Sequence, residues 1–230
     1  MKREDIDACF AVCFTGYKDR APRLLGELKR AGIDDVDVIW NFPTPYDNFI
    51  MSRIPVLPVI KKKPGYFSAG MGQYRAMKTA YHRGMERILI VEDDCRFLKD
   101  VDRVWDTLEK APCDGNILML DSFKVQRCGD TANGWAPLKV GRSTACLVMD
   151  RKAMARFIEM HESPVSGKYA HPMLRICDHW LDQKYAPGLK MYFSDPKLAI
   201  QCNTPNASNS GPQGVSIYYK NINFDDYAPY

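Results

Sequence analysis

The stretch ILIVEDDC, residues 88–95, decides the fold class that we expect for this chain. Four consecutive aliphatic residues are typical of a strand that is buried on both faces, and three acids follow them directly. The preceding residues, 68–84, have apolar side chains at spacings of three or four, which predicts an amphipathic helix with Ser68 as its N-cap and Gly84 as its stop. A helix that leads into a buried strand is typical of an α/β sheet, where ligands bind at the carboxyl ends of the strands. The acids therefore lie at an edge where a ligand is expected.

The rest of the chain continues this alternation of strands and helices. We expect strands at 8–14, 36–40, 116–120, 143–149, 189–193 and 197–201, and helices at 22–31, 101–110, 151–160 and 174–185. Prolines make 41–66 a long loop, 121–142 is a polar loop, and the residues from 202 onward have the composition of a mobile tail or lid. We predict a single α/β domain over 1–230 with a mostly parallel central sheet flanked by helices. Its first half reaches to about residue 100, its second half covers about 101–201, and the tail is 202–230.

The composition excludes several classes of protein. Hydrophobic residues are 46% and charged residues 26% of the chain, as in a globular protein, and a formal charge of +4 without a concentrated basic face argues against nucleic-acid binding. The apolar stretch 54–60 is interrupted by two prolines and is far shorter than the roughly 20 residues of a membrane-spanning helix. The N-terminus does not fit a signal peptide, so we expect a cytoplasmic protein. The eight cysteines lack metal-like spacing and are expected to be reduced, with Cys95 pointing into the core.

Three interpretations of the acids can be compared from the residues themselves. ILIVEDD and the later NILMLD resemble the acidic strands of phosphorelay receivers, but a receiver needs two helices and a strand between them, about 12 plus 5 plus 12 residues. Only 21 residues, Cys95 to Gly115, lie there, so the receiver does not fit. A solvated turn that caps the next helix remains open. The third interpretation is a cation site, because adjacent carboxylates repel one another and hard oxygen ligands suit Mn²⁺ or Mg²⁺.

Four stretches resemble, in order, the family 25 glycosyltransferases of the lipooligosaccharide-biosynthesis type. The most specific is GMGQYRAMKTAYHRGMERILIVEDDCRFLKD, residues 70–100, and the others are CFTGYKDRAPRLLGELKRAGI, STACLVMDRKAMARFI, and RICDHWLDQKY with DPKLAIQ. The resemblance covers most of residues 8–201. It implies a GT-A-like fold, the fold of nucleotide-diphospho-sugar transferases. Ala76 and Met77 stand where the family usually has a Ser-His pair.

The resemblance also implies roles for the residues that match its motifs. Asp94 is the expected metal ligand, with Glu92 or Asp93 near the ribose or a metal-bound water. His179 is a further candidate ligand or supports one. Thr15, Gly16 and Arg20 follow the first strand, where such folds hold the nucleotide, and the planar fork of Arg20 suits a phosphate.

A base must activate the acceptor hydroxyl in an inverting transfer. Asp178 matches the family's acidic position and is the first candidate, and Asp121, at the end of strand 116–120, is the second. An alternative stays open for Arg20, and for Asp178 with its neighbour His179: they can be ordinary exposed polar side chains.

The expected function is the metal-dependent transfer of a sugar from a nucleoside diphosphate sugar to a glycan of the bacterial surface. A UDP-sugar is the first candidate for the donor. The acceptor is a glycan or a lipid-linked glycan, and the basic loop with Arg53 and Lys61 to Lys63 suggests a peripheral contact with the inner membrane. The departure at Ala76 and Met77 keeps a second interpretation open, a non-catalytic domain of the same fold that binds sugar nucleotides or glycans.

Overall fold

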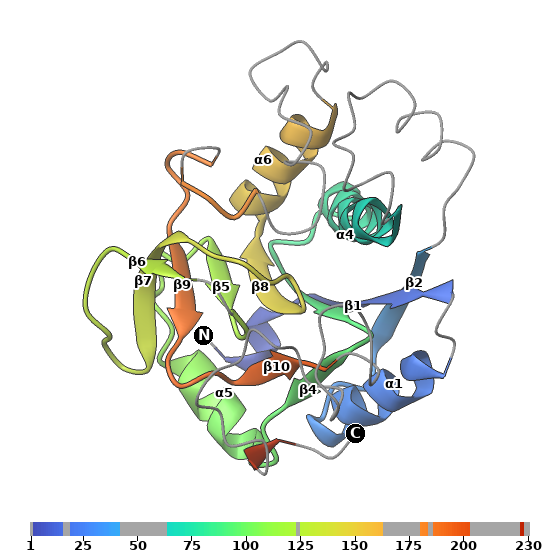
Figure 1. Ribbon diagram of the computed structural model, residues 1–230, viewed down its shortest axis with the longest axis horizontal. Coiled ribbons are helices and arrows are strands. Elements are labelled where there is room, and N and C mark those ends of the chain that lie inside the picture. Colours follow the sequence, from blue (N-terminus) through green and yellow to red (C-terminus); the bar gives the residue numbers. More distant parts are fainter. Residues whose placement is uncertain are drawn as a thin grey trace.

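The computed structural model describes residues 2–15, 19–41, 64–122, 125–162, 180–183, 186–202 and 226–227, with the backbone alone for 64–68. In chain order its elements are η1 (Arg3–Asp5), β1 (Ala8–Phe14), α1 (Arg20–Arg30), β2 (Val36–Asn41), α4 (Pro64–His82), β3 (Arg87–Glu92), β4 (Cys95–Phe97), α5 (Val101–Glu109), β5 (Ile117–Met119), β6 (Gln126–Arg127), β7 (Trp135–Val140), β8 (Cys146–Asp150), α6 (Arg151–Glu162), β9 (Met191–Ser194) and β10 (Ala199–Gln201). Figure 1 shows their arrangement.

Eight strands form one sheet in the order β2-β1-β3-β8-β5-β9-β7-β6, and β4 and β10 form a separate antiparallel pair (Figure 1). The strands β2, β1 and β3 are parallel, β8 is antiparallel to both of its neighbours, and β5 is parallel to β9. The strand β7 pairs antiparallel with β9 and with β6. All strands of this sheet except β8 and β7 therefore run in one direction, which confirms the predicted α/β fold with a mostly parallel sheet flanked by helices.

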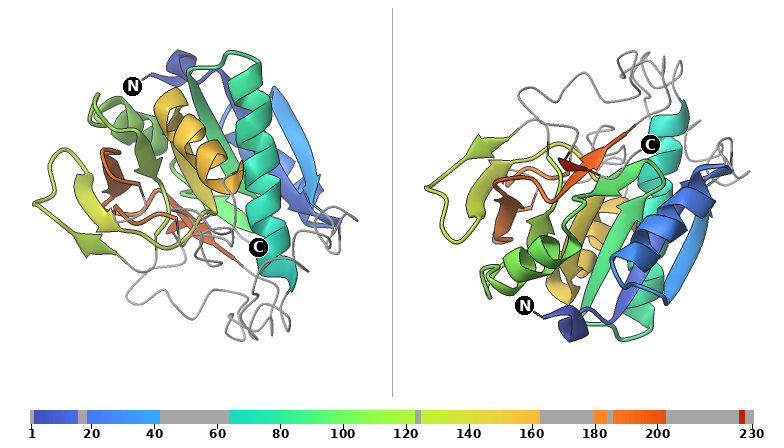
Figure 2. Two further views of the ribbon diagram at one scale, coloured as in Figure 1. Left: turned by 90° about the horizontal axis from the view of Figure 1, so that it is seen from above. Right: turned by 90° about the horizontal axis from the view of Figure 1, so that it is seen from below.

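Helices cover both faces of the sheet. Figure 2 shows α4 and α6 on one face, and α1 and α5 on the other, together with the β4–β10 pair. The side chains of β1 alternate between these faces, as a pleated strand requires: Cys9, Ala11 and Cys13 pack on the α1 side, and Phe10 and Val12 pack on the α4 side. The sheet therefore has two apolar cores, one on each face, and this explains why β1 and β3 read as continuous apolar runs.

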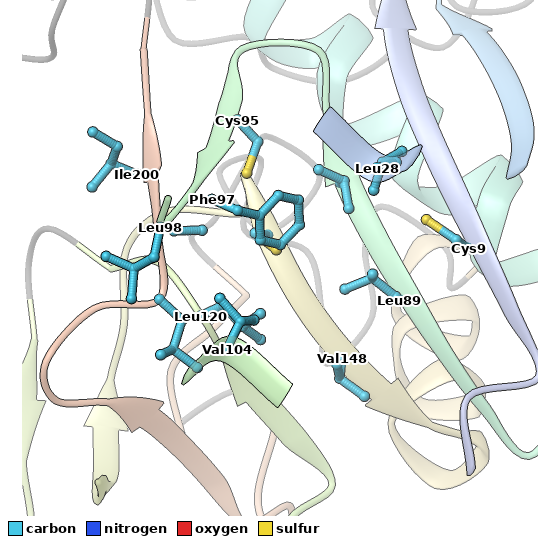
Figure 3. Packing of buried hydrophobic residues seen from close by; sticks show 14 of the residues in the cluster. Cys9, Leu28, Leu89, Cys95, Phe97, Leu98, Val104, Leu120, Val148 and Ile200 are labelled. Carbon is cyan, nitrogen blue, oxygen red and sulfur yellow. The ribbon is translucent and has the colours of Figure 1, made fainter. Parts of the chain in front are cut away.

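The core on the α1 side includes the strand that directly follows the acids. Figure 3 shows Cys95 and Phe97 of β4 among Leu28 of α1, Leu89 of β3 and Ile200 of β10. Cys95 is 4% exposed, so its expected place in the core is confirmed. Burying a Leu or Phe side chain stabilises the fold by roughly 1.5–3 kcal/mol, and these contacts therefore anchor the turn that carries the acids. The seven cysteines in the described residues form no disulfide.

Three predictions about the elements are wrong. The helix before β3 begins at Pro64, not after an N-cap at Ser68, because proline is favoured in a first helical turn, where no N–H is needed. The segment 121–142 contains β6 and β7, since Trp135 and Leu138 are buried and pair with β9. The sequence predicts a helix at 174–185, but residues 180–183 are not helical. There the backbone N–H groups of Gly141 and Gln183 donate to the carbonyls of Leu181 and Lys139, which continues the hydrogen bonding at the end of β7.

Several other predictions concern residues that the structure does not describe. They are residues 42–63 of the predicted loop, which include Arg53 and Lys61 to Lys63, the rest of 174–185, and the tail from 203 onward apart from 226–227. Among the helices that are described, none combines the length and the apolar character needed to cross a bilayer.

Two glycines in helices provide a matched test of the packing. A Cβ added at Gly72 of α4 would lie 2.6 Å from Cγ1 of Val12, whereas a Cβ at Gly26 of α1 would meet nothing within 4 Å. Gly72→Ala is therefore expected to destabilise the protein by about 1–3 kcal/mol through overpacking. Gly26→Ala is expected to stabilise it by about 0.5–1 kcal/mol, because alanine has the higher helix propensity. Urea unfolding of both variants measures the difference, and equal stability of the two would contradict the close approach of α4 to β1.

Candidate functional site

The acidic stretch ends β3 and turns into β4 at the carboxyl edge of the sheet. The N–H of Asp93 donates to the carbonyl of Val12 in β1 (3.1 Å), and the N–H of Cys202 donates to the carbonyl of Asp94 (2.6 Å). The turn is thus attached to β1 on one side and to the end of β10 on the other. Because β1 and β3 are parallel neighbours, their carboxyl ends meet there, at the expected ligand-binding edge.

The Asp93 side chain is bound by protein groups. Its Oδ2 accepts a hydrogen bond from the N–H of Phe14 at 2.7 Å, and its Oδ1 lies 3.4 Å from Nη1 of Arg20. Burial raises the pKa of Asp93, while the Phe14 N–H and the Arg20 guanidinium oppose that shift. Asp93 therefore holds the end of β1 and the start of α1 together.

Arg20, the first residue of α1, is 5% exposed. Its Nη1 atom lies 3.4 Å from Asp93 Oδ1 and 3.8 Å from Asp94 Oδ2, so one guanidinium faces two carboxylates. A buried charge of this kind is tolerated only when it is paired. Arg20 offsets part of the repulsion between the two acids.

Asp94 is the most deeply buried acid of the three. The residue is 8% exposed, its Oδ2 accepts a hydrogen bond from Nε2 of Gln201 (3.2 Å), and within the described part of the chain no group donates a hydrogen bond to Oδ1. Burial, followed by the charges of Glu92 and Asp93, raises the pKa of Asp94 well above its ordinary value. A buried carboxylate oxygen without a donor is costly, so this atom marks a place for a cation or a donor group.

Glu92 points to the other face of the sheet. Its Oε1 accepts hydrogen bonds from Nε2 of Gln73 in α4 (2.6 Å) and from Oγ1 of Thr144 (2.8 Å). Successive side chains of a strand alternate between faces, and Glu92 follows the alternation that places Ile88 and Ile90 on the α4 side. The acidic triplet is therefore divided between two faces of the sheet and does not form one cluster.

A cavity of about 200 Å³ opens beside Asp93 and Asp94 on the α1 side. Its lining combines both acids with charged and apolar groups of α1 and β4: Arg23, Leu24, Gly26, Glu27, Cys95 and Arg96. Sites for drug-sized ligands start at roughly 300 Å³, so this cavity has room for only a part of such a ligand, for example a phosphate group or a base. Three acidic residues, Asp93, Asp94 and Glu27, and two arginines, Arg23 and Arg96, thus line the same cavity.

The other predicted site residues lie at the same edge or outside the described residues. Thr15 follows β1 directly and is partly exposed. Asp121 follows β5, is 1% exposed, and its Oδ2 accepts a hydrogen bond of 2.6 Å from Oγ of Ser143. Gly16, Asp178 and His179 lie outside the described residues. The structure thus brings Arg20, Asp93 and Asp94 into contact and places Glu92 and Asp121 on either side of the start of β8.

Sequence reasoning gave no role to the residues that hold these acids. Gln73, Thr144 and Gln201 lie 19, 52 and 107 positions from the acids that they bind, and Ser143 lies 22 positions from Asp121. Gln201 ends the DPKLAIQ stretch, whose resemblance to family 25 assigned no contact to this glutamine. No local spacing connects such residues, because they meet only where helices and strands that are distant in the sequence pair and pack.

The donor set can be compared with the needs of a divalent ion. Within the described ranges, no group of three or more His, Cys, Asp or Glu side chains is arranged so that it could hold a metal ion. Mg²⁺, however, usually binds through one or two carboxylates together with water and substrate phosphates. The Oδ1 atom of Asp94, to which no described group donates, fits that second arrangement, in which the substrate brings most of the ligands.

Comparisons with known proteins give structural similarities only. No family model and no curated protein matches the sequence. Mannose-1-phosphate geranyltransferase from Thermus thermophilus is 10% identical with a TM-score of 0.41, covering 81% of this chain and 73% of its own. Mouse xyloside xylosyltransferase 1 is 8% identical with a TM-score of 0.33 (77% and 79%). A glycosyltransferase involved in glycosylation of the major capsid of PBCV-1 is 8% identical with a TM-score of 0.34 (81% and 92%). All three similarities are loose.

Proposed function

We propose that this chain is a glycosyltransferase of the GT-A type, related to family 25, that takes a sugar from a nucleoside diphosphate sugar. The observation that carries the proposal is the carboxylate of Asp94, which is buried at the carboxyl edge of an α/β sheet with one oxygen that no described group satisfies. The order and spacing of the four stretches that resemble family 25 support the same function.

The cofactor of this proposal is Mn²⁺ or Mg²⁺. Asp94 would hold the ion, with Glu92 and His179 as the further candidates, although Oε1 of Glu92 already accepts two hydrogen bonds. When bound, the ion offsets the negative charge that develops on the leaving diphosphate. Asp93 serves mainly as a structural acid in this scheme, because both of its oxygens face protein donors.

The arginines of the site differ in their expected roles. Arg20 lies against two carboxylates, so it positions Asp93 and Asp94 rather than pairing chiefly with a phosphate. Arg23 and Arg96 line the cavity beside these acids and are placed to face an anionic group that enters it. Thr15 and Gly16 would contact the nucleotide at the end of β1.

The finer parts of the proposal concern the acceptor. The transfer is inverting, with Asp178 as the base, and the acceptor is a glycan or lipid-linked glycan of the bacterial surface. The donor is a UDP-sugar, and the enzyme works in the cytoplasm with a peripheral contact to the inner membrane. These assignments follow from the resemblance to family 25 and are proposals.

Calorimetric titration tests the function directly. UDP, UDP-glucose and UDP-galactose are expected to bind in the presence of Mn²⁺ and to lose about tenfold or more in affinity in EDTA, because Asp94 would hold the ion that offsets the charge of the diphosphate. Slow release of UDP from the same sugars in water would show catalysis. Binding that is unchanged in EDTA, without any UDP release, would favour a non-catalytic binding domain, and the absence of any nucleotide binding would contradict the proposal.

A further inference from the structure

The strand β8 separates two strands that end in carboxylates. Glu92 ends β3 and Asp121 follows β5, and β8 pairs antiparallel with both. The N–H of Glu92 donates to the carbonyl of Ala145 (2.8 Å), and the N–H of Leu120 donates to the carbonyl of Cys146 (3.0 Å). The residues that lead into β8 therefore lie between the two acids.

Two neighbouring hydroxyl groups reach these acids. Ser143 donates to Oδ2 of Asp121 at 2.6 Å, and Thr144 donates to Oε1 of Glu92 at 2.8 Å. Both residues are 4% exposed. Ser143 and Thr144 are adjacent in the chain and extend to opposite sides of β8. They therefore connect Glu92, at the end of β3, with Asp121, which follows β5.

The backbone at Ser143 is strained. Its φ angle is +115°, a region that L-residues rarely adopt and that favours glycine. Strain of this kind persists only where the surrounding structure imposes it, and it is concentrated at functional sites. A glycine would fit the backbone better, so the serine side chain has another reason to be there. Its hydroxyl makes contacts that a glycine could not make: it donates to Oδ2 of Asp121 and accepts from the N–H of Ala145 at 3.3 Å.

We propose that Ser143 and Thr144 form a hydroxyl bridge that positions Glu92 and Asp121, and that Asp121 is a positioning residue of the site rather than its base. This inference rests on the proposed glycosyltransferase function and deepens it. A base must contact the acceptor hydroxyl, whereas Asp121 is 1% exposed and binds Ser143 through Oδ2. The geometry thus leaves the role of base to a residue outside the bridge.

Substitutions at Ser143 separate the hydroxyl from the backbone strain. Ser143→Ala removes the hydroxyl and keeps the strain, and Ser143→Gly removes both. If the bridge positions the acids, both variants lower kcat/KM for UDP release from the UDP-sugar that the wild type uses by about 10- to 100-fold, mainly through kcat. Ser143→Gly should nevertheless unfold at a higher temperature than Ser143→Ala. Activity that follows thermal stability across the two variants would indicate a purely structural role and overturn the proposal.

Thr144 gives an isosteric control at the other end of the bridge. Thr144→Val keeps the shape and removes the donor to Glu92, and Thr144→Ser keeps the donor. We expect a loss of about 10- to 100-fold in kcat/KM for the valine and recovery to within about threefold for the serine. Wild-type activity of the valine variant would overturn the bridge at this position, even if the Ser143 variants failed to fold.

Variants of Asp121 decide between a positioning residue and a base. Asp121→Asn keeps an oxygen that accepts the Ser143 hydrogen bond, so its kcat/KM should stay within about tenfold of the wild type, while Asp121→Ala should lose as much as Ser143→Ala. Loss of a general base costs roughly 10²- to 10⁴-fold, and asparagine cannot serve as one. If Asp121→Asn is as inactive as Asp121→Ala, the inference about Asp121 is overturned, while the proposed glycosyltransferase function is not affected. A wild type that neither binds nor turns over any UDP-sugar overturns the proposed function, and the inference with it.

Discussion

Asp94→Asn is expected to abolish metal-dependent nucleotide binding and, at the same time, to stabilise the fold. Binding is lost because the amide lacks the charge that holds a divalent ion. Stability rises because the wild-type carboxylate is buried, the charges of Glu92 and Asp93 oppose its ionisation, and one of its oxygens is satisfied by no described group. The expected gain is on the order of 1 kcal/mol, which corresponds to an increase of roughly 2–4 °C in the thermal midpoint. Calorimetric titration with UDP and Mn²⁺ and thermal unfolding measure the two effects.

The stabilisation should depend on pH. The pKa of Asp94 is raised in the folded state by burial first and then by the charges of Glu92 and Asp93. The folded state therefore binds this proton more tightly than the unfolded state, where the pKa is about 3.9. The contribution of Asp94 to wild-type stability is complete below about pH 3.9 and is lost as the pH rises through the raised pKa. Because asparagine does not ionise, the advantage of Asp94→Asn should grow with pH and level off above that pKa.

A surface acid provides the control for this prediction. Asp106 lies exposed in α5, and Asp106→Asn should leave nucleotide binding unchanged. Nucleotide affinity of Asp94→Asn equal to that of the wild type would contradict the metal assignment. A thermal midpoint below the wild type at neutral pH would contradict the account of the buried charge.

Arg20→Met is expected to destabilise the protein by about 3–5 kcal/mol. The substitution leaves the carboxylates of Asp93 and Asp94 buried without the guanidinium that lies 3.4 and 3.8 Å from them, and removing one partner of a buried ion pair has a cost of this size. Methionine is shorter than arginine but keeps an unbranched chain that fills the space of the arginine stem, so the lost charge is expected to dominate the change. Urea unfolding gives the free energy of unfolding, and an unchanged m-value would show that the same transition is measured.

Arg23 on the same helix is the matched control. Its side chain is 40% exposed and pairs with Asp19 at 3.6 Å, a surface ion pair that contributes at most about 1 kcal/mol. Combining Arg20→Met with Asp94→Asn should restore part of the lost stability, because the second change removes one of the unpaired charges. Equal effects of Arg20→Met and Arg23→Met, or strictly additive effects in the double variant, would refute the assigned role of Arg20.

Much of the fold could be predicted from local patterns. The strands β1 and β3 and the helix α5 lie within one residue of their predicted limits, because apolar runs and helical spacing are properties of neighbouring residues. The strand β4 was missed because three residues are too few for a pattern, and β7 was missed because Pro137 and several polar neighbours hide its buried side chains. Both strands are defined by partners that lie far away in the sequence.

The sequence by itself determined that this chain forms an α/β sheet and that three acids stand at the carboxyl end of one of its strands. Only the tertiary structure decided how these acids differ. The pleat directs Glu92 to the α4 side, while Asp93 and Asp94 face Arg20, and Gln73, Thr144 and Gln201 reach the acids from other elements. The physical reason is that a hydrogen bond or a buried charge pair depends on distances in space. Those distances follow from the way in which helices and strands far apart in the sequence pair and pack, and the local order of residues says little about this arrangement.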